Sequence, residues 1–161
     1  MSREETIKLL NFYNGRNRLI IEILLLTGIR VGELASIHKS NLTENEIKLV
    51  CKGNKERTIY LPEETARKLK KYANSISKDK LFPNRRNIQR IVTIAMNKIG
   101  IEGSTHTLRH TSATMMYQRT HDILLVKEFL GHSTVLSTQI YTHINNDEIK
   151  RAVESNPLNF I

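Results

Sequence analysis

The sequence predicts an α+β fold that is mainly α-helical and carries one small antiparallel β-hairpin. Three observations lead to this prediction. A dense apolar run, "LIIEILLL" at 19–26, is typical of a buried helix. In "EIKLVCKGNKERTIYLP" at 46–62, apolar residues alternate on both sides of a Gly-Asn pair, as they do in a hairpin. A second apolar stripe has helical spacing and consists of Ile88, Ile91, Val92, Ala95 and Ile99.

The first half of the chain is expected to place helices on either side of the hairpin. The apolar helix is expected over 16–27, and Gly28 ends it because glycine readily adopts the left-handed conformation of a C-cap. A short helix is expected over 31–37. Pro62 ends the second strand and opens a helix over 63–73. The inward-facing residues of that helix are Ala66, Leu69 and Ala73.

The second half of the chain carries polar residues suited to helix N-caps. Asn84 precedes the striped helix, Thr105 is expected to cap the helix that contains "HTLRH", and Asp122 precedes a third helix. Gly131 ends that third helix. Two short helices are expected further on, over 134–141 and 147–154.

Length and composition describe one soluble domain. The 161 residues are enough for one core and too few for two comfortable ones. Glu22 interrupts the apolar run, so this run is expected in a buried helix and no membrane span is predicted. The single cysteine, Cys51, excludes an internal disulfide and a cysteine-based zinc site. A cytoplasmic location is therefore expected.

The net charge of +9 is concentrated in the middle third of the chain. Lys and Arg outnumber Asp and Glu there by 13 to 4 over 51–100, against 7 to 6 over 1–50 and 5 to 6 over 101–161. A basic block of this kind indicates a polyanionic partner, of which nucleic acid is the commonest. A solvated lysine-rich surface would give the same count.

Several basic residues have spacings that suit a bound phosphate. In a helix, His106, Arg109 and His110 fall at i, i+3 and i+4, on one face. Arg30 lies between two glycines, with Glu33 three residues on to orient it. The two remaining candidates are Lys52 in the hairpin turn and His132 between two predicted helices. Each of these residues also has an ordinary explanation, as a surface charge, a turn residue or a helix cap.

The histidine spacing bears on a metal site, and two tyrosines are candidates for a nucleophile. The one histidine pair at i, i+4 encloses Arg109, which would repel a dication, so metal chemistry is not favoured. Tyr117 follows His106 by three helical turns, and Tyr141 follows His132 at the end of a short polar segment. Spacing alone does not choose between these two tyrosines as nucleophile.

Four segments together resemble the catalytic domain of tyrosine recombinases, the Xer-type and phage-integrase enzymes. They are "TGIRVGEL", "CKGNKERTIYLP", "HTLRH" and "LGHSTVLSTQIYTH", and they occur in the family's order and spacing. The positions that match the family's catalytic residues are Arg30, Lys52, His106, Arg109, His132 and Tyr141. Glu33 matches the acidic neighbour of the first arginine, and Tyr141 is preferred to Tyr117 on this resemblance.

The resemblance implies that Tyr141 attacks a DNA phosphodiester, giving a 3′-phosphotyrosine and a free 5′-hydroxyl. Arg30, Arg109 and His132 would hold the non-bridging oxygens, with His106 as the candidate base and Lys52 as the candidate acid. No metal, ATP or other cofactor is implied. The expected phosphate contacts on flanking DNA are Lys55, Arg57, Arg67, Lys68, Lys70, Lys71, Arg85, Arg86 and Arg90.

The resemblance runs from about residue 16 to the tail, and it implies one catalytic domain over 1–161, without the N-terminal DNA-clamping domain that these recombinases usually carry. The tail segment over 145–161 is expected to pass between protomers of a tetramer on double-stranded DNA, with a monomer in free solution. Packing of its apolar end against its own domain is the alternative. The alternatives to a recombinase are type IB topoisomerase-like relaxation, a non-catalytic DNA-binding regulator, and a metal-dependent nuclease.

Overall fold

The structure, a computed structural model, describes residues 1–51 and 55–131. These residues form seven α-helices, one 3-10 turn and a two-stranded antiparallel sheet, which confirms the predicted fold class. The predicted hairpin turn, the two short helices after residue 131 and the 145–161 tail lie outside the described residues. Within the described chain, no helix is long and apolar enough to cross a membrane.

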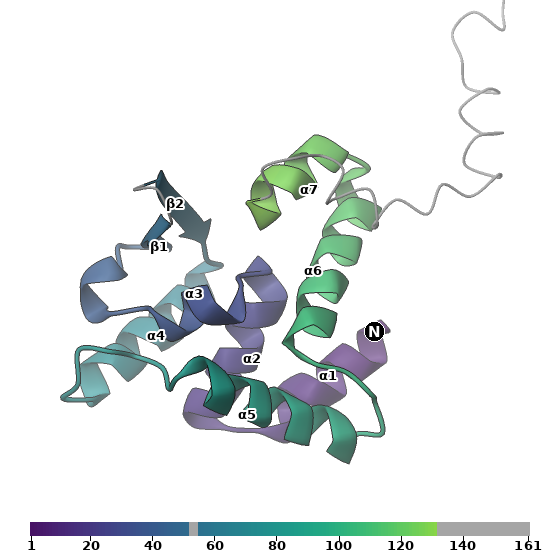
Figure 1. The fold of residues 1–161 in the computed structure, drawn as a ribbon, viewed down its shortest axis with the longest axis horizontal. Coiled ribbons are helices and arrows are strands. Elements are labelled where there is room, and N and C mark those ends of the chain that lie inside the picture. The colour runs from purple at the N-terminus through teal and green to yellow at the C-terminus, as the bar shows by residue number, and fades with distance from the viewer. Residues whose placement is uncertain (52–54, 132–161) are drawn as a thin grey trace, which may run out of the picture.

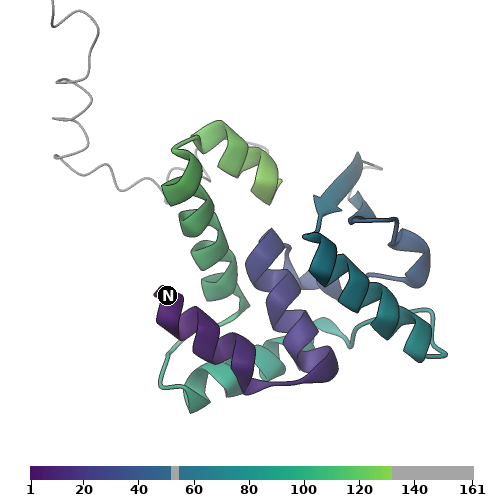
Figure 2. The same ribbon diagram turned by 180° about the vertical axis from the view of Figure 1, so that it is seen from behind.

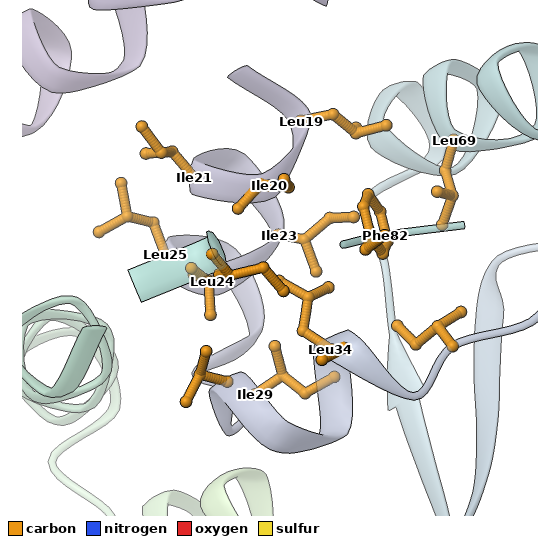
Figure 3. Close-up of a cluster of buried hydrophobic side chains, with 14 of the residues drawn as sticks. Leu19, Ile20, Ile21, Ile23, Leu24, Leu25, Ile29, Leu34, Leu69 and Phe82 are labelled. Atoms are coloured by element: carbon orange, nitrogen blue, oxygen red, sulfur yellow. The ribbon is translucent and has the colours of Figure 1, made fainter. Parts of the chain in front are cut away.

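Helix α2 (Gly15–Thr27) is the centre of the domain, as Figure 1 shows. Helices α1, α4, α5 and α6 all contact it. Its apolar residues are buried on nearly every side, which is typical of a helix surrounded by others. Figure 3 shows this cluster, in which side chains of α2 meet Ile29, Leu34, Leu69 and Phe82. The helix ends at Gly28, which has φ +58° as predicted for a left-handed C-cap.

Helix α1 (Arg3–Phe12) was not predicted, and it packs against α2 and α5. It begins with a capping box, in which the Ser2 hydroxyl accepts the Glu5 N–H at 3.1 Å and the Glu5 carboxylate accepts the Ser2 N–H at 2.7 Å. Only Leu9 is fully buried, so the apolar stripe is weak. The Ser-x-x-Glu spacing was the available signal.

The hairpin consists of β1 (Glu46–Cys51) and β2 (Lys55–Tyr60), paired from Glu46↔Tyr60 to Cys51↔Lys55. Its buried face carries Ile47, Leu49 and Ile59, as the alternation predicted. Arg57 lies directly opposite Leu49 in this register and therefore shares the buried face.

Helix α4 (Glu63–Ser75) follows Pro62 and buries Ala66, Leu69 and Ala73, in agreement with the prediction. Helix α3 (Val31–Ala35) and the 3-10 turn Lys39–Asn41 lead from α2 to the hairpin. Helix α5 (Arg85–Lys98) begins at Asn84, whose side chain accepts the Asn87 N–H at 2.9 Å. Seen from behind in Figure 2, α4 runs beside α2 and below the hairpin.

Helices α6 (Thr105–Thr120) and α7 (Ile123–Leu130) contact each other on the other side of α2, where α7 crosses the end of α6 at a steep angle in Figure 1. The prediction of Thr105 as N-cap is wrong by one residue. Ser104 is the cap, because its hydroxyl accepts the His106 N–H at 3.2 Å while the Thr107 hydroxyl accepts the Ser104 N–H at 3.0 Å. Asp122 caps α7 and Gly131 ends it at φ +63°, as predicted.

Candidate active site

Two arginines from distant parts of the sequence meet at the carboxyl end of α7. Arg109 projects from α6, is 9% exposed, and donates Nη1 to the Gly28 carbonyl and Nη2 to the Leu130 carbonyl, the latter at 2.8 Å. Arg30, the residue before α3, donates Nη2 to the Gly131 carbonyl at 3.3 Å. The two guanidinium groups thus bind carbonyls of adjacent residues, immediately before His132 in the sequence.

Glu33 fixes the orientation of Arg30 in two ways. Its Oε2 accepts the Arg30 backbone N–H at 2.9 Å, and its Oε1 accepts Arg30 Nη1 at 3.0 Å. Burial alone would raise the pKa of Glu33. The Arg30 backbone N–H, the Arg57 charge and the Arg30 guanidinium outweigh that effect and hold the pKa below its ordinary 4.5. Glu33 is therefore a carboxylate at neutral pH, consistent with the expected supporting role.

Arg57 does not occupy the surface position expected of a DNA contact. Its side chain is 12% exposed, and its Nη1 donates to both oxygens of Glu33 at 3.0 and 2.9 Å. Its Nη2 donates to the Phe129 carbonyl at 3.0 Å. Arg57 therefore joins the hairpin to α3 and to the end of α7. Sequence reasoning missed this role, although the alternation with Ile59 was a signal that Arg57 faces inward.

The three cationic positions of "HTLRH" do not form one uniform face. His106 and His110 are exposed, whereas Arg109 is buried against α7. His110 lines an open groove of about 640 Å³ together with Met1, Thr111 and Met115. Arg109 thus points inward, because the Gly28 and Leu130 carbonyls that it binds lie on that side of α6.

Tyr117, the rejected nucleophile candidate, belongs to a small apolar cluster between α6 and α7. It packs against Ala113, Val126 and Leu130. Its ring also meets the ring of His121 edge-on, with centroids 5.9 Å apart. A packing role accounts for this tyrosine. Tyr141, with which it was compared, lies outside the described residues, as do Lys52 and His132.

The predicted flanking contacts on α4 and α5 are exposed, and two of them, Arg67 and Lys68, also form ion pairs. Lys71, Arg85, Arg86 and Arg90 are exposed on α4 and α5. Lys68 donates to the buried carboxylate of Glu22 at 3.1 Å, and Arg67 pairs with Glu64 at 2.5 Å. Lys55 begins β2, and its side chain is not among those that the structure describes.

The chain belongs to the phage integrase family, whose sequence pattern matches residues 1–148. This match confirms the resemblance seen in the four motifs. The chain is 36% identical to the tyrosine recombinase XerC of Caldanaerobacter subterraneus subsp. tengcongensis, over 98% of this chain and 51% of that protein. It thus spans about half the length of the curated relatives it matches.

Solved structures with the same fold include two that resemble this chain along most of its length. One is the XerH site-specific recombinase bound to its difH substrate before cleavage, at 27% identity and a TM-score of 0.80, covering 96% of this chain and 53% of that one. The other is the catalytic domain of bacteriophage HP1 integrase, at 29% identity and a TM-score of 0.73, covering 99% of this chain and 95% of that one. The predicted tyrosine-recombinase catalytic-domain fold is confirmed.

Proposed function

We propose that this chain is the catalytic domain of a site-specific DNA recombinase. In this proposal Tyr141 attacks a DNA phosphodiester and forms a 3′-phosphotyrosine, releasing a 5′-hydroxyl. The 5′-hydroxyl of another strand then attacks the phosphotyrosine, which re-forms a phosphodiester and frees the tyrosine. The bond energy is kept in the intermediate, so neither ATP nor a metal ion enters these steps.

One observation carries the proposal: Arg30 and Arg109 converge on the carbonyls of Gly131 and Leu130. A guanidinium group can bind two phosphate oxygens at once and keeps its charge at any physiological pH. Two such groups held in place beforehand would stabilise the extra negative charge of a five-coordinate phosphorus. Arg30 keeps 47% of its side chain exposed, so a phosphate can approach it. His132, next in sequence, is the proposed third donor.

Proton transfer is assigned to two further residues. A tyrosine hydroxyl has an ordinary pKa of about 10 and must lose its proton to attack at neutral pH. His106 is exposed at the start of α6, beside Arg109 on the next turn, and is the proposed base. Lys52 is the proposed acid that protonates the departing 5′-oxygen.

The proposed partner is double-stranded DNA, bound largely through its phosphates. Lys55, Lys71, Arg85, Arg86 and Arg90 are proposed as flanking contacts, which give affinity that falls with salt and depends little on sequence. Lys68 forms an ion pair with Glu22, so its charge is largely neutralised within the protein. We place the activity in the cytoplasm, where a chain with one cysteine is stable without disulfides.

Assembly into a tetramer on DNA, from a monomer in free solution, is part of the same proposal. The apolar tail residues Leu158, Phe160 and Ile161 are proposed to dock on a neighbouring protomer. Deleting residues 155–161 should abolish higher-order complexes on DNA in a native gel. Unchanged assembly by the truncated chain would overturn this part.

The central experiment is to capture the covalent intermediate. The chain is incubated in EDTA with a duplex that is nicked beside the cleavage position, so that the short 5′-hydroxyl fragment leaves and religation fails. A protein–DNA adduct on a denaturing gel is expected, and Tyr141→Phe should remove it while Tyr117→Phe should not. Cleavage that requires a divalent ion, or an adduct that survives Tyr141→Phe, would overturn the proposal.

The role of Lys52 has its own test. A 5′-bridging phosphorothioate supplies a leaving group that needs no protonation. Cleavage by Lys52→Ala should therefore be restored on this substrate and remain slow on the ordinary phosphodiester. Equal impairment on both substrates would remove Lys52 from the acid role.

A further inference from the structure

The carboxyl end of α7 is capped by three arginines, one for each successive carbonyl. The last carbonyls of a helix lack partners within the helix and carry partial negative charge. Here Arg57 binds the Phe129 carbonyl, Arg109 binds that of Leu130, and Arg30 binds that of Gly131. The preceding carbonyl, of Glu128, accepts the Gly131 N–H at 2.9 Å.

Arg57 differs from Arg30 in how much of its side chain is bound within the protein. Nη1 is held by both oxygens of Glu33, and Nη2 is held by Phe129. Its third nitrogen, Nε, lies against the α-carbon of Gly131, where an added Cβ would be 2.7 Å away. The side chain is 12% exposed, against 47% for Arg30. Nη1 and Nη2 of Arg57 are thus both engaged within the protein.

Arg57 is also the link between three elements that carry catalytic positions. Its own strand, β2, pairs with β1, which ends at Cys51, the residue before Lys52 in the sequence. Its bond to Glu33 fixes the carboxylate that holds both the backbone and the side chain of Arg30. Its bond to Phe129 fixes the end of α7, three residues before His132.

We propose that Arg57 is a positioning residue for the cleavage reaction, acting through Glu33 and the end of α7 to aim Arg30 at the phosphate. The inference rests on the proposed function. It replaces the role of phosphate contact that the sequence predicts for Arg57. Without Arg57, Glu33 keeps one guanidinium partner instead of two, and Arg30 loses its fixed direction relative to Gly131.

The test compares Arg57→Gln with Arg3→Gln, which removes the same charge from an exposed position on α1. Single-turnover cleavage of the nicked duplex should fall by up to about 100-fold for Arg57→Gln, since misplacement of a catalytic group by about 1 Å has that effect. DNA affinity and its salt dependence should match those of Arg3→Gln. Arg57→Lys should have a cleavage rate between those of Arg57→Gln and wild type, because a lysine can reach Glu33 but cannot bind Glu33 and Phe129 together.

A substrate with a methylphosphonate at the cleaved position separates positioning from a general loss of structure. This group lacks one charged non-bridging oxygen and so requires less stabilisation by Arg30. The defect of Arg57→Gln should be several-fold smaller on the methylphosphonate than on the phosphodiester. If Arg57→Gln only reduced the fraction of correctly folded protein, cleavage of both substrates would slow by the same factor.

Three results would overturn the proposal. The first is an equal defect on both substrates, and the second is unchanged cleavage by Arg57→Gln. The third is weaker DNA binding with a salt slope reduced by about one, which identifies a phosphate contact. If the wild-type chain forms no covalent adduct, the proposed function and this inference fail together. A wild-type adduct with any of the three results removes this inference alone.

Discussion

The molecule has two cationic regions that differ in what their charges contact. At the end of α7, Arg30, Arg57 and Arg109 are bound to main-chain carbonyls and to one carboxylate. On α4 and α5, Lys71, Arg85, Arg86 and Arg90 are exposed to solvent. The four exposed residues contribute +4 to the net charge of +9, and the first region, with Glu33 counted, contributes +2.

The difference shows that the number of charges and their arrangement report different properties. An exposed lysine or arginine attracts a polyanion but has no fixed direction, so it contributes affinity that salt screens. A guanidinium held by several acceptors has lost its rotational freedom before the substrate arrives, which is the condition for stabilising a transition state. The four predictions below test this contrast, from the largest expected effect to the smallest.

Replacement of Arg109 should have the largest effect. Arg109→Gln removes a buried charge that donates to both Gly28 and Leu130, so covalent adduct formation should slow by at least 10²- to 10³-fold. The free energy of unfolding should also fall by about 1–3 kcal/mol, because two buried carbonyls lose their donor. Single-turnover cleavage and urea denaturation measure the two effects. Cleavage within about threefold of wild type would contradict the assignment.

Replacement of Glu33 should make the free energy of unfolding less dependent on pH. Because the folded-state pKa of Glu33 is lowered, its ionised form stabilises the fold above the ordinary pKa of 4.5, and this contribution is lost as the pH falls through the lowered value. Urea midpoints of Glu33→Gln should therefore be lower than those of wild type at pH 7. The difference should narrow below pH 4.5. A constant difference across this range would contradict the ion-pair interpretation.

Gly28 should be more sensitive to substitution than Gly15, although both have φ +58°. A Cβ at Gly28 would lie 2.9 Å from Leu130 Cδ2, whereas one at Gly15 meets nothing within 4 Å. Gly15→Ala should therefore cost about 1 kcal/mol for the backbone alone, and Gly28→Ala more, by the added contact with α7. If urea denaturation shows the same loss of unfolding free energy for both variants, Leu130 on α7 moves away from the added Cβ at little cost.

Replacement of Arg86 should have the smallest effect on the stability of the protein and should change the salt dependence of DNA binding. It is exposed on α5, so Arg86→Gln should change the free energy of unfolding by less than about 0.5 kcal/mol. If Arg86 contacts a phosphate, the slope of log affinity against log salt should decrease by about one. Fluorescence anisotropy at several salt concentrations measures this slope, with Arg3→Gln as the matched control.

Much of the fold was predictable because its signals are local. Glycine C-caps at 28 and 131, the Asn84 and Asp122 N-caps, the apolar helix at 19–26 and the alternating hairpin all depend on residues close together in sequence. Helix α1 escaped prediction because its one buried residue, Leu9, gives no clear stripe. The cap of α6 was misplaced because adjacent serine and threonine residues are both good caps.

The sequence by itself determined the fold class, the family and the chemical types of the candidate residues, because motifs and periodicity are carried by neighbouring positions. It did not separate Arg57, which lies inside the molecule, from the basic residues that surround it in the sequence. Only the tertiary structure decided that Arg30, Arg57 and Arg109 share the end of α7. The physical reason is that three unpaired carbonyls, created by a helix that ends at Gly131, need donors that distant elements supply.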